Sequence, residues 1–276
     1  MTSYHCHTQF CDGASTAEEI LLAAIEAKFP AIGFSSHAPV PFPTCWTMPK
    51  DKMGSYILEM LNLMDKYGDR IEIYRGFEVD YIKDEISAKS KHIVDFYPDF
   101  LISSIHFMDK LVIDGERWTI DNTSAEFKQG LDEIYGGDIK KLVRDFTQQS
   151  ADMMELGGFD IVGHIDKVYQ YGKEYLSLDD KWYRNEILSL LELAKAKKYI
   201  VEINTKYYET MGFFFPHQDF MKDIKEMKIP VQVNSDCHAS NMITTGYDAA
   251  YQALKAAGVV KERVMLDGEW IDIKIK

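Results

Sequence analysis

The sequence predicts an α/β barrel of the TIM type, in which parallel strands alternate with helices. Short apolar runs alternate with longer segments of helical periodicity along most of the chain. The chain has 276 residues, and α/β barrels of about this length often form one domain. Histidine and acidic residues recur directly after the apolar runs, at the strand ends where the active sites of such barrels lie.

Seven apolar runs rich in Ile, Val, Phe and Tyr are predicted as buried parallel strands. They cover residues 3–7, 31–36, 71–79, 100–105, 160–163, 199–204 and 230–235. Successive βα units require right-handed crossovers. A closed barrel and an open, doubly wound sheet both fit this order, and the distribution of histidines described below favours the barrel.

Helical periodicity predicts the elements between these strands. Residues 15–18, with the sequence Ser-Thr-Ala-Glu, have the pattern of a capping box and precede apolar residues at helical spacing. Further helices are predicted between Met53 and Gly68 and over residues 139–156, 181–198 and 247–257. The last of these stops at Gly258, as helices commonly do.

The composition is that of an acidic globular protein. Hydrophobic residues make up 46% and charged residues 27%, and the net charge is −13. No basic footprint for nucleic acid is present, so no nucleic-acid partner is expected. No apolar run approaches the roughly 20 residues of a membrane span, and nothing before Tyr4 reads as a signal peptide. The four cysteines form no C-x-x-C motif, so we expect reduced thiols, no membrane partner and a cytoplasmic location.

Six of the eight histidines lie at or just after the carboxyl ends of predicted strands: His5, His7, His37, His106, His164 and His238. Glu78 and Asp236 lie at two of the same ends. These ends converge at one mouth of a barrel. In His5-Cys6-His7 and in residues 236–238, positions i and i+2 point to the same side, so the ligand-type side chains can share a pocket. Imidazoles gathered with carboxylates predict a site for zinc, manganese or iron.

Two other residues have two interpretations each, and a third is expected away from the site. Asp12, in the loop after His7, is either a metal ligand or a turn residue before Gly13. His217 is either a pocket residue or the start of a helix, and His92 is expected on the surface of a helix.

Six motifs around these residues resemble the PHP family of phosphoesterases, which is named for polymerase and histidinol phosphatase. In chain order they are His5-Cys6-His7-Thr8, Ser36-His37-Ala38-Pro39, Gly76-Phe77-Glu78-Val79, Ser104-Ile105-His106, Gly163-His164-Ile165-Asp166 and Ser235-Asp236-Cys237-His238. The match runs from about residue 3 to residue 240. Residues 37–48, 159–167 and 202–205 resemble the histidinol phosphatase branch more specifically.

The resemblance implies a distorted (β/α)7 barrel, one PHP-type domain over residues 1–276, that holds two to three divalent transition metal ions. It implies one metal on His5, His7, Glu78 and Asp236, a second on Glu78, His106 and His164, and a third on Asp12, His37 and His238. On this branch the reaction is hydrolysis of L-histidinol phosphate, a small phosphorylated metabolite of histidine biosynthesis, to L-histidinol and inorganic phosphate.

For catalysis, the resemblance implies Glu78, Asp236 and His238. A hydroxide held between two metals bridged by Glu78 would attack phosphorus in line. Asp236 is a candidate acceptor for the proton of the nucleophile. The proton of the leaving oxygen would come from a metal-bound water or His238. Candidate substrate contacts, each with a structural alternative, are Phe42, Trp46, Ser104, Arg117, Lys206 and His217.

Other functions remain open from the sequence. A PHP phosphoesterase with another phosphomonoester is one, with a sugar phosphate, phosphotyrosine or a nucleotide as its substrate. A catalytically silent PHP interaction domain is another, although the intact set of ligands argues against it. Metal-dependent amide hydrolysis on a related barrel is a third, which fold analogy does not exclude. Monomer and homodimer fit equally.

Overall fold

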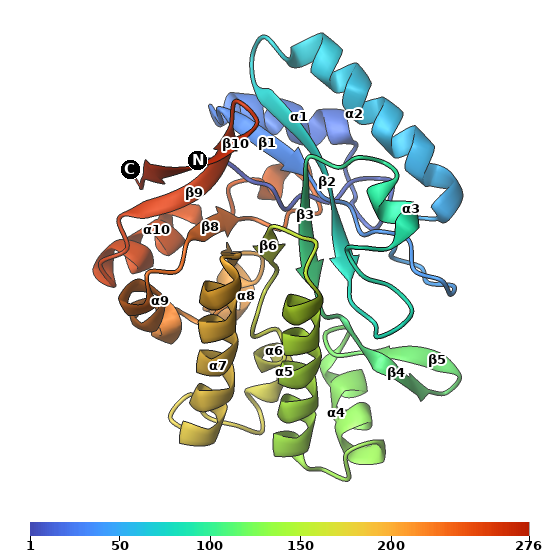
Figure 1. The fold of residues 1–276 in the computed structure, drawn as a ribbon, viewed down its shortest axis with the longest axis vertical. Coiled ribbons are helices and arrows are strands. Elements are labelled where there is room, and N and C mark those ends of the chain that lie inside the picture. The colour runs from blue at the N-terminus through green and yellow to red at the C-terminus, as the bar shows by residue number, and fades with distance from the viewer. Residues whose placement is uncertain (276) are drawn as a thin grey trace.

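The computed structural model describes residues 1–275 and shows a curled parallel sheet with helices on its outside (Figure 1). Six strands pair in the order β1 (Ala31–Phe34), β2 (Glu72–Asp80), β3 (Phe100–Ser104), β6 (Ile161–Val162), β7 (Ile200–Asn204) and β8 (Val231–Asn234). Every pairing within this sheet is parallel. The predicted distorted TIM-like α/β fold is therefore confirmed.

The prediction of a regular strand over residues 3–7 is wrong. Residues 3–7, which we call the seam segment, form only isolated bridges, from Ser3 to Ile32 on β1 and from Cys6 to Cys237 after β8. The chain bends at Tyr4, where the backbone N–H donates to the side-chain Oδ1 of Asn234 at 2.8 Å and not to a backbone carbonyl. A side-chain hydrogen bond thus replaces one of the backbone hydrogen bonds expected between strands. Isolated hydrogen bonds join the seam segment to β1 and to the residues after β8.

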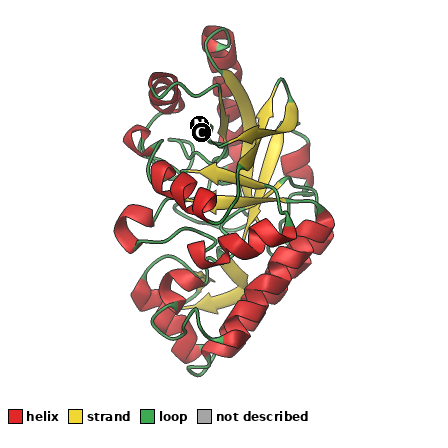
Figure 2. Ribbon diagram, turned by 90° about the vertical axis from the view of Figure 1, so that its left-hand side faces the viewer, coloured by secondary structure: helices red, strands yellow, loops and turns green. Residues whose placement is uncertain are grey.

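Helices pack around the sheet, as Figure 2 shows. The longer ones are α1 (Ala17–Glu26), α2 (Met53–Tyr67), α4 (Ser124–Glu133), α5 (Ile139–Leu156), α7 (Lys181–Lys197) and α10 (Tyr247–Ala256). Shorter ones are α3 (Lys91–Val94), α6 (Tyr169–Gly172), α8 (Tyr208–Met211) and α9 (Met221–Met227). The helices expected at 53–67, 139–156, 181–198 and 247–257 all form within one residue of their predicted ends.

The capping box of α1 lies one residue later than predicted. Thr16 is the N-cap, and its side chain and the Glu19 carboxylate exchange hydrogen bonds with each other's backbone N–H groups. The Ser15 hydroxyl is unavailable for this role because it accepts from the backbone N–H of Ser240 at 3.0 Å. The correction follows from a contact with a segment distant in sequence.

Two antiparallel hairpins lie outside the predicted pattern. One joins β4 (Phe107–Ile113) to β5 (Glu116–Thr119), and the other joins β9 (Lys261–Leu266) to β10 (Glu269–Lys274). The first follows β3 at the carboxyl end of the sheet. The second packs beside β8, near both chain ends in Figure 1.

Inside the barrel, the amino-terminal ends of the strands are filled with apolar side chains, and we call this region the closed end. Its buried cluster consists of Tyr4, Ala31, Tyr74, Phe100, Ile102, Ile161, Ile200, Val264 and Met265. Gly33 makes room for it, because a Cβ there would lie 2.7 Å from the Phe100 ring. The Tyr4 hydroxyl donates to the Met265 carbonyl and accepts from its N–H, so the β9–β10 hairpin is fixed across this end.

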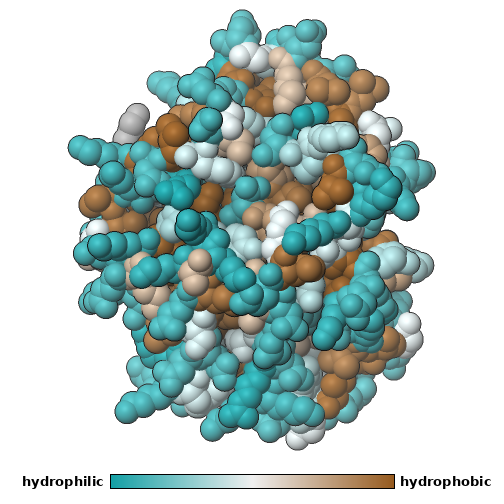
Figure 3. Space-filling view, in the orientation of Figure 1, coloured by the Kyte–Doolittle hydropathy of each residue, from teal (hydrophilic) through white to brown (hydrophobic). Residues whose placement is uncertain are grey.

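The outer surface is mostly hydrophilic on the face shown in Figure 3, with small and separate apolar patches. Within residues 1–275, none of the helices has both the length and the apolar character that crossing a bilayer requires. All four cysteines are free thiols, in agreement with the expectation from their spacing.

Candidate metal centre and substrate cavity

The nine predicted metal ligands lie together at the mouth of the barrel, opposite the closed end. His5 and His7 come from the seam segment, and Glu78 lies near the end of β2. The loop after β1 carries His37, those after β3 and β6 carry His106 and His164, and the loop after β8 carries Asp236 and His238. Parallel strands end on the same side of a sheet, which explains why residues so distant in sequence meet here.

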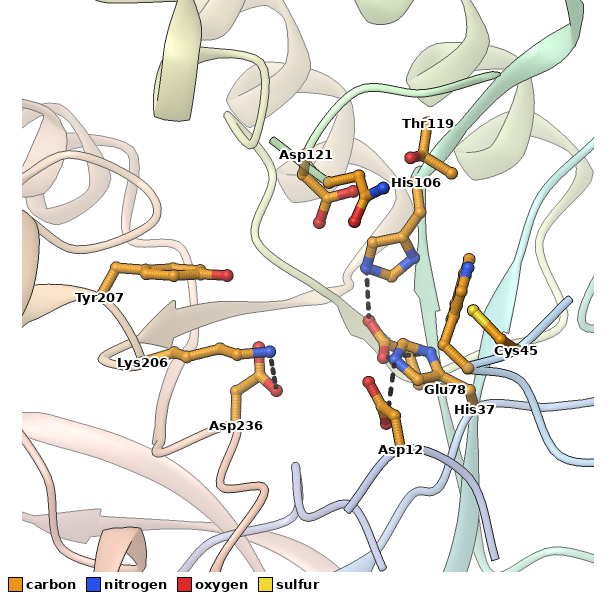
Figure 4. Close-up of a pocket in the computed structure, with 12 residues that line it drawn as sticks. Asp12, His37, Cys45, Glu78, His106, Thr119, Asp121, Lys206, Tyr207 and Asp236 are labelled. Carbon is orange, nitrogen blue, oxygen red and sulfur yellow. Dashed lines mark hydrogen bonds and ion pairs between the residues drawn. The ribbon is translucent and has the colours of Figure 1, made fainter. Parts of the chain in front are cut away.

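The Glu78 carboxylate occupies the middle of this cluster, and Figure 4 shows it close to His37 and His106. Its Oε2 lies 3.1 Å from His5 Nε2, 3.5 Å from His7 Nε2 and 3.0 Å from His37 Nδ1. Its Oε1 lies 2.9 Å from His164 Nε2 and 3.7 Å from His106 Nε2. The two oxygens therefore face two different groups of imidazoles, a geometry in which one carboxylate can bridge two cations.

A third group of ligand atoms surrounds Asp12. Its Oδ2 lies 3.1 Å from His238 Nε2, and its Oδ1 lies 3.6 Å from His7 Nδ1 and 3.9 Å from His37 Nε2. Ligand atoms of these four residues all lie within 4.8 Å of one another. Asp12 is thus more than a turn residue before Gly13, because its carboxylate is part of the cluster.

Asp236 reaches the cluster from a strained backbone. Its Oδ1 lies 3.1 Å from His7 Nε2 and 3.7 Å from His5 Nε2. Its φ of 48° is in the left-handed region that residues other than glycine rarely adopt. Asn204 Nδ2 donates to Asp236 Oδ2 at 3.0 Å and helps to hold this conformation. Such strain is common at functional sites, where the surrounding structure maintains it.

Several buried atoms of the cluster lack a hydrogen-bond partner anywhere in residues 1–275. They include His5 Nε2, His7 Nε2, His37 Nδ1 and Glu78 Oε2. Leaving a buried polar group unsatisfied costs about 1–3 kcal/mol, so native structures rarely do it. Converging imidazole and carboxylate lone pairs are the ligands that transition metals prefer. The residues present therefore fit a site for several metal ions.

Two buried carboxylates, to which the sequence analysis assigned no role, orient the imidazoles. Glu202 on β7 accepts from His5 Nδ1 at 2.6 Å and from the backbone N–H of His164 at 2.9 Å. Asp80 accepts from the backbone N–H and the Nδ1 of His106 at 2.9 and 3.1 Å. Because Nδ1 donates in both rings, the Nε2 lone pairs are free to face Glu78. Asp80 could have been found from the sequence, since it lies two residues after Glu78 on the same strand face.

The charges in the cluster depend on one another. Burial alone would raise the pKa of Glu78, but His5, His37 and His106 hold it well below its usual range. Burial lowers the pKa of His37 to about 4. Burial alone would also lower the pKa of His106, yet the carboxylates of Asp80 and Glu78 raise its pKa to about 9. A protonated His106 thus supplies positive charge when no cation is bound, and a metal ion would have to displace such protons.

A cavity of about 240 Å³ opens onto the cluster, and the predicted contacts Trp46 and Lys206 line it. Lys206 Nζ lies 3.5 Å from Asp236 Oδ1 and 3.2 Å from His238 Nε2. The Trp46 ring stands edge-on to His37, with centroids 4.6 Å apart. Phe42 is outside the lining and packs with Trp46 against Phe107, where it supports the wall.

Besides Phe42, three more predicted substrate contacts lie outside the cavity lining. Arg117 is paired with Glu85 at 2.7 Å. Ser104 is fully buried beside Gly163, where a Cβ would lie 2.3 Å from its Oγ. His217 Nδ1 accepts the N–H of Asp219 at 3.2 Å and begins a short helical turn. The structural alternative therefore describes all three better than a substrate contact does.

His92 is also more engaged than the surface position expected for it. It is half-buried, and its ring Nε2 lies 3.2 Å from the Pro39 carbonyl oxygen. The imidazole must be the donor in this hydrogen bond, because a carbonyl can only accept. The contact fixes α3 to the loop that carries His37, yet leaves His92 outside the cluster.

Five other residues of the lining were not predicted from the sequence. They are Cys45, Thr119, Asp121, Asn122 and Tyr207. Thr119 ends the unpredicted β4–β5 hairpin, and the next two of these residues follow it. Only Tyr207 could have been inferred, as the neighbour of Lys206.

A barrel whose mouth gathers histidines and carboxylates around a shared carboxylate defines the class of metal-assisted α/β-barrel hydrolases. The family model described as "PHP domain" matches residues 3–206. This chain belongs to the PHP family. It lies on the histidinol-phosphatase branch and is an enzyme of the phosphoric monoester hydrolase class.

The relatives on this branch cover nearly the whole chain. The histidinol-phosphatase of Bacillus subtilis is 26% identical over 265 residues, which are 89% of this chain and 96% of the relative. A crystal structure of the putative histidinol phosphatase of Listeria monocytogenes superimposes with a TM-score of 0.79 at 23% identity, covering 90% of this chain and 99% of that one. The Lactococcus lactis histidinol phosphate phosphatase, crystallised with zinc, L-histidinol and phosphate, superimposes with a TM-score of 0.73 at 20% identity and 98% coverage of both chains. At these identities the two structures support the fold.

Proposed function

We propose that this chain hydrolyses L-histidinol phosphate to L-histidinol and inorganic phosphate in histidine biosynthesis. The observation that carries the proposal is the Glu78 carboxylate between two groups of imidazoles, in a chain of the histidinol-phosphatase branch. The Lactococcus lactis relative bound both products of this reaction, L-histidinol and phosphate. The adjoining cavity, with Lys206 beside the cluster, is suited to a small anionic ester.

We further propose that two to three divalent ions of zinc, manganese or iron bind the cluster. The first would use His5, His7, Glu78 and Asp236, the second Glu78, His106 and His164, and the third Asp12, His37 and His238. Bound ions would neutralise the phosphoryl oxygens and lower the pKa of water. The buried nitrogens without partners and the zinc in the Lactococcus lactis relative support this assignment.

For the chain's own residues, we assign catalysis to Glu78, Asp236 and His238. Asp236 Oδ1 is our candidate to accept the proton of the attacking water. Lys206 would attract the phosphate, since its Nζ lies beside Asp236 and His238. The Trp46 ring at the cavity wall would pack against the leaving group.

A panel of phosphomonoesters tests the substrate. Release of inorganic phosphate should be fastest from L-histidinol phosphate and much slower from a sugar phosphate, phosphotyrosine and a nucleotide. Comparable rates on all four would favour the alternative of a general PHP phosphoesterase. No release from any of them by metal-loaded protein would favour the silent interaction domain.

We also propose that residues 1–276 form a single domain, although the family model ends at residue 206. Strand β8 and the loop that carries Asp236 lie beyond that residue, yet β8 pairs with β7 in the same sheet. Limited proteolysis should give no stable fragment that ends near residue 206. From the sequence we keep the expectation of a cytoplasmic monomer or homodimer without a nucleic-acid partner.

A further inference from the structure

Two charged side chains that belong to none of the predicted metal ligands, Lys206 and Asp121, lie on different walls of the cavity. At the cluster wall, Lys206 lies between Asp236 and His238. On the other wall, Asp121 follows the β4–β5 hairpin, and its carboxylate points into the space framed by His106, Tyr207 and Lys206 (Figure 4). Asp121 belongs to none of the groups whose ligand atoms converge, so its role is not explained by metal binding.

A buried lysine holds Asp121 from behind. Lys167 Nζ lies 3.2 Å from Asp121 Oδ2, and only 2% of the Lys167 side chain is exposed. The same ammonium group lies 4.9 Å from the centre of the Tyr207 ring and 5.2 Å from that of Phe215. Lys167 itself does not line the cavity. It is therefore a fixed counter-ion that keeps Asp121 ionised and restrains its rotamer.

The backbone of Asp121 is held as well. Its carbonyl accepts a hydrogen bond from Gln170 Nε2 at 3.3 Å, and Gln170 is fully buried. The Asp121 side chain is 17% exposed, and it lines the cavity. Because the carboxylate and the backbone of Asp121 are both held in place, little conformational entropy is lost when a ligand binds the carboxylate.

An ionised carboxylate on this wall can accept a charge-assisted hydrogen bond from an ammonium group and has no donor to offer a phosphate oxygen. We infer that Asp121 selects phosphomonoesters whose leaving group carries a protonated amine, with Lys167 as its positioning residue. The inference rests on the proposed phosphatase function and adds to it a residue that decides the substrate class. The phosphate would bind at the cluster wall beside Lys206, and the ammonium group would bind Asp121.

Paired substrates test the inference. Asp121→Asn keeps the shape of the side chain and removes its charge. It should lower kcat/KM for L-histidinol phosphate by roughly 10- to 100-fold, the worth of a charge-assisted hydrogen bond. With the phosphate ester that lacks only the α-amine, the variant should match the unmodified protein within about twofold. Asp223→Asn is a matched control, since it breaks an ion pair with Arg184 that lies outside the cavity.

The products provide a second readout that does not depend on turnover. Inhibition by L-histidinol should weaken in Asp121→Asn by the same factor as kcat/KM, while inhibition by inorganic phosphate should not weaken. Lys167→Met should change the two inhibition constants in the same directions. An equal loss on both esters, or weaker inhibition by phosphate, would show that Asp121 supports the cluster and would overturn the inference.

The unmodified protein separates the inference from the function on which it rests. If it hydrolyses both esters equally well, the phosphatase function stands and the selection of an amine by Asp121 fails. If it hydrolyses neither ester, the proposed function itself fails.

Discussion

The two ends of the barrel interior are built by the same strands but differ in chemistry. The first residues of β3, β6 and β7, which are Phe100, Ile161 and Ile200, fill the closed end with apolar side chains. At the other ends of the first two strands, His106 and His164 bury imidazoles around Glu78. The closed end gains stability by excluding water, whereas the mouth loses stability by burying atoms without partners. The difference indicates that the mouth is maintained for function.

The largest effect should come from the mouth. His164→Ala removes one of the two rings that face Glu78 Oε1. We expect kcat/KM for L-histidinol phosphate to fall on the order of 10³-fold, as when other enzymes lose a charge-stabilising group. The melting temperature of chelator-treated protein should change by only a few degrees, corresponding to about 1 kcal/mol. His92→Ala, outside the cluster, is the control, and an equal loss of activity in it would remove the distinction.

The reverse pattern is expected at the closed end. In Gly33→Ala, the new Cβ would lie 2.7 Å from the Phe100 ring and 2.8 Å from the Tyr4 ring. Because both rings are buried, we expect a loss of about 1–3 kcal/mol, or a fall in melting temperature of up to roughly 10 °C. Calorimetry measures the loss, and kcat/KM per folded molecule should stay within about twofold. Loss of activity without loss of stability would contradict the division between the two ends.

The sequence predicts most of both regions because each depends on a local pattern. Strand periodicity finds all six strands of the sheet, and β6 is found despite its short length. The position of a residue at a strand end then places eight of the nine ligands at one mouth, whereas Asp12, in the loop after His7, is not decided by this argument. Even where the strand itself is not regular, at residues 3–7, His5 and His7 face the same pocket.

What the sequence does not predict depends on contacts between distant segments. The β4–β5 hairpin has a register shift between Phe107 and Val112, so its pattern does not alternate cleanly and the cavity wall that follows it was missed. For Arg117 the sequence leaves both a substrate contact and a structural role open, because its partner Glu85 is 32 residues away. A capping pattern at residues 15–18 was shifted by one position because Ser15 contacts Ser240.

An intermediate effect is expected between the two ends, from the carboxylates that orient the imidazoles. Glu202→Gln and Asp80→Asn each keep the size of the side chain and introduce an amide N–H where an acceptor is needed. Each should weaken metal binding by roughly 10- to 100-fold. Because Glu202 contacts His5 and Asp80 contacts His106, the two variants should lose ions from different positions.

Elemental analysis after dialysis against chelators of graded affinity measures this loss, and anomalous diffraction from crystals identifies the vacant position. Glu72→Gln, at the amino-terminal end of β2, is the matched control and should retain every ion. Loss of the same ion from both Glu202→Gln and Asp80→Asn would mean that the two carboxylates act on the cluster as a whole and not on individual rings.

The smallest effect should come from a buried carboxylate far from the mouth. Glu262 on β9 is 3% exposed, and its Oε1 accepts from the Tyr251 hydroxyl at 2.9 Å. Burial raises the pKa of Glu262, and Tyr251 and the N-terminal ammonium group offset this only partly. At Glu78, by contrast, imidazoles outweigh burial and the pKa falls.

A raised pKa in the folded state means that stability is lost as the pH rises through that value. Glu262→Gln should therefore match the unmodified protein near pH 4 and exceed it at pH 7, by about 1 kcal/mol. Thermal unfolding of both proteins across this pH range checks the sign. If Glu262→Gln is instead less stable than the unmodified protein at pH 7, the ionised carboxylate has a stabilising partner.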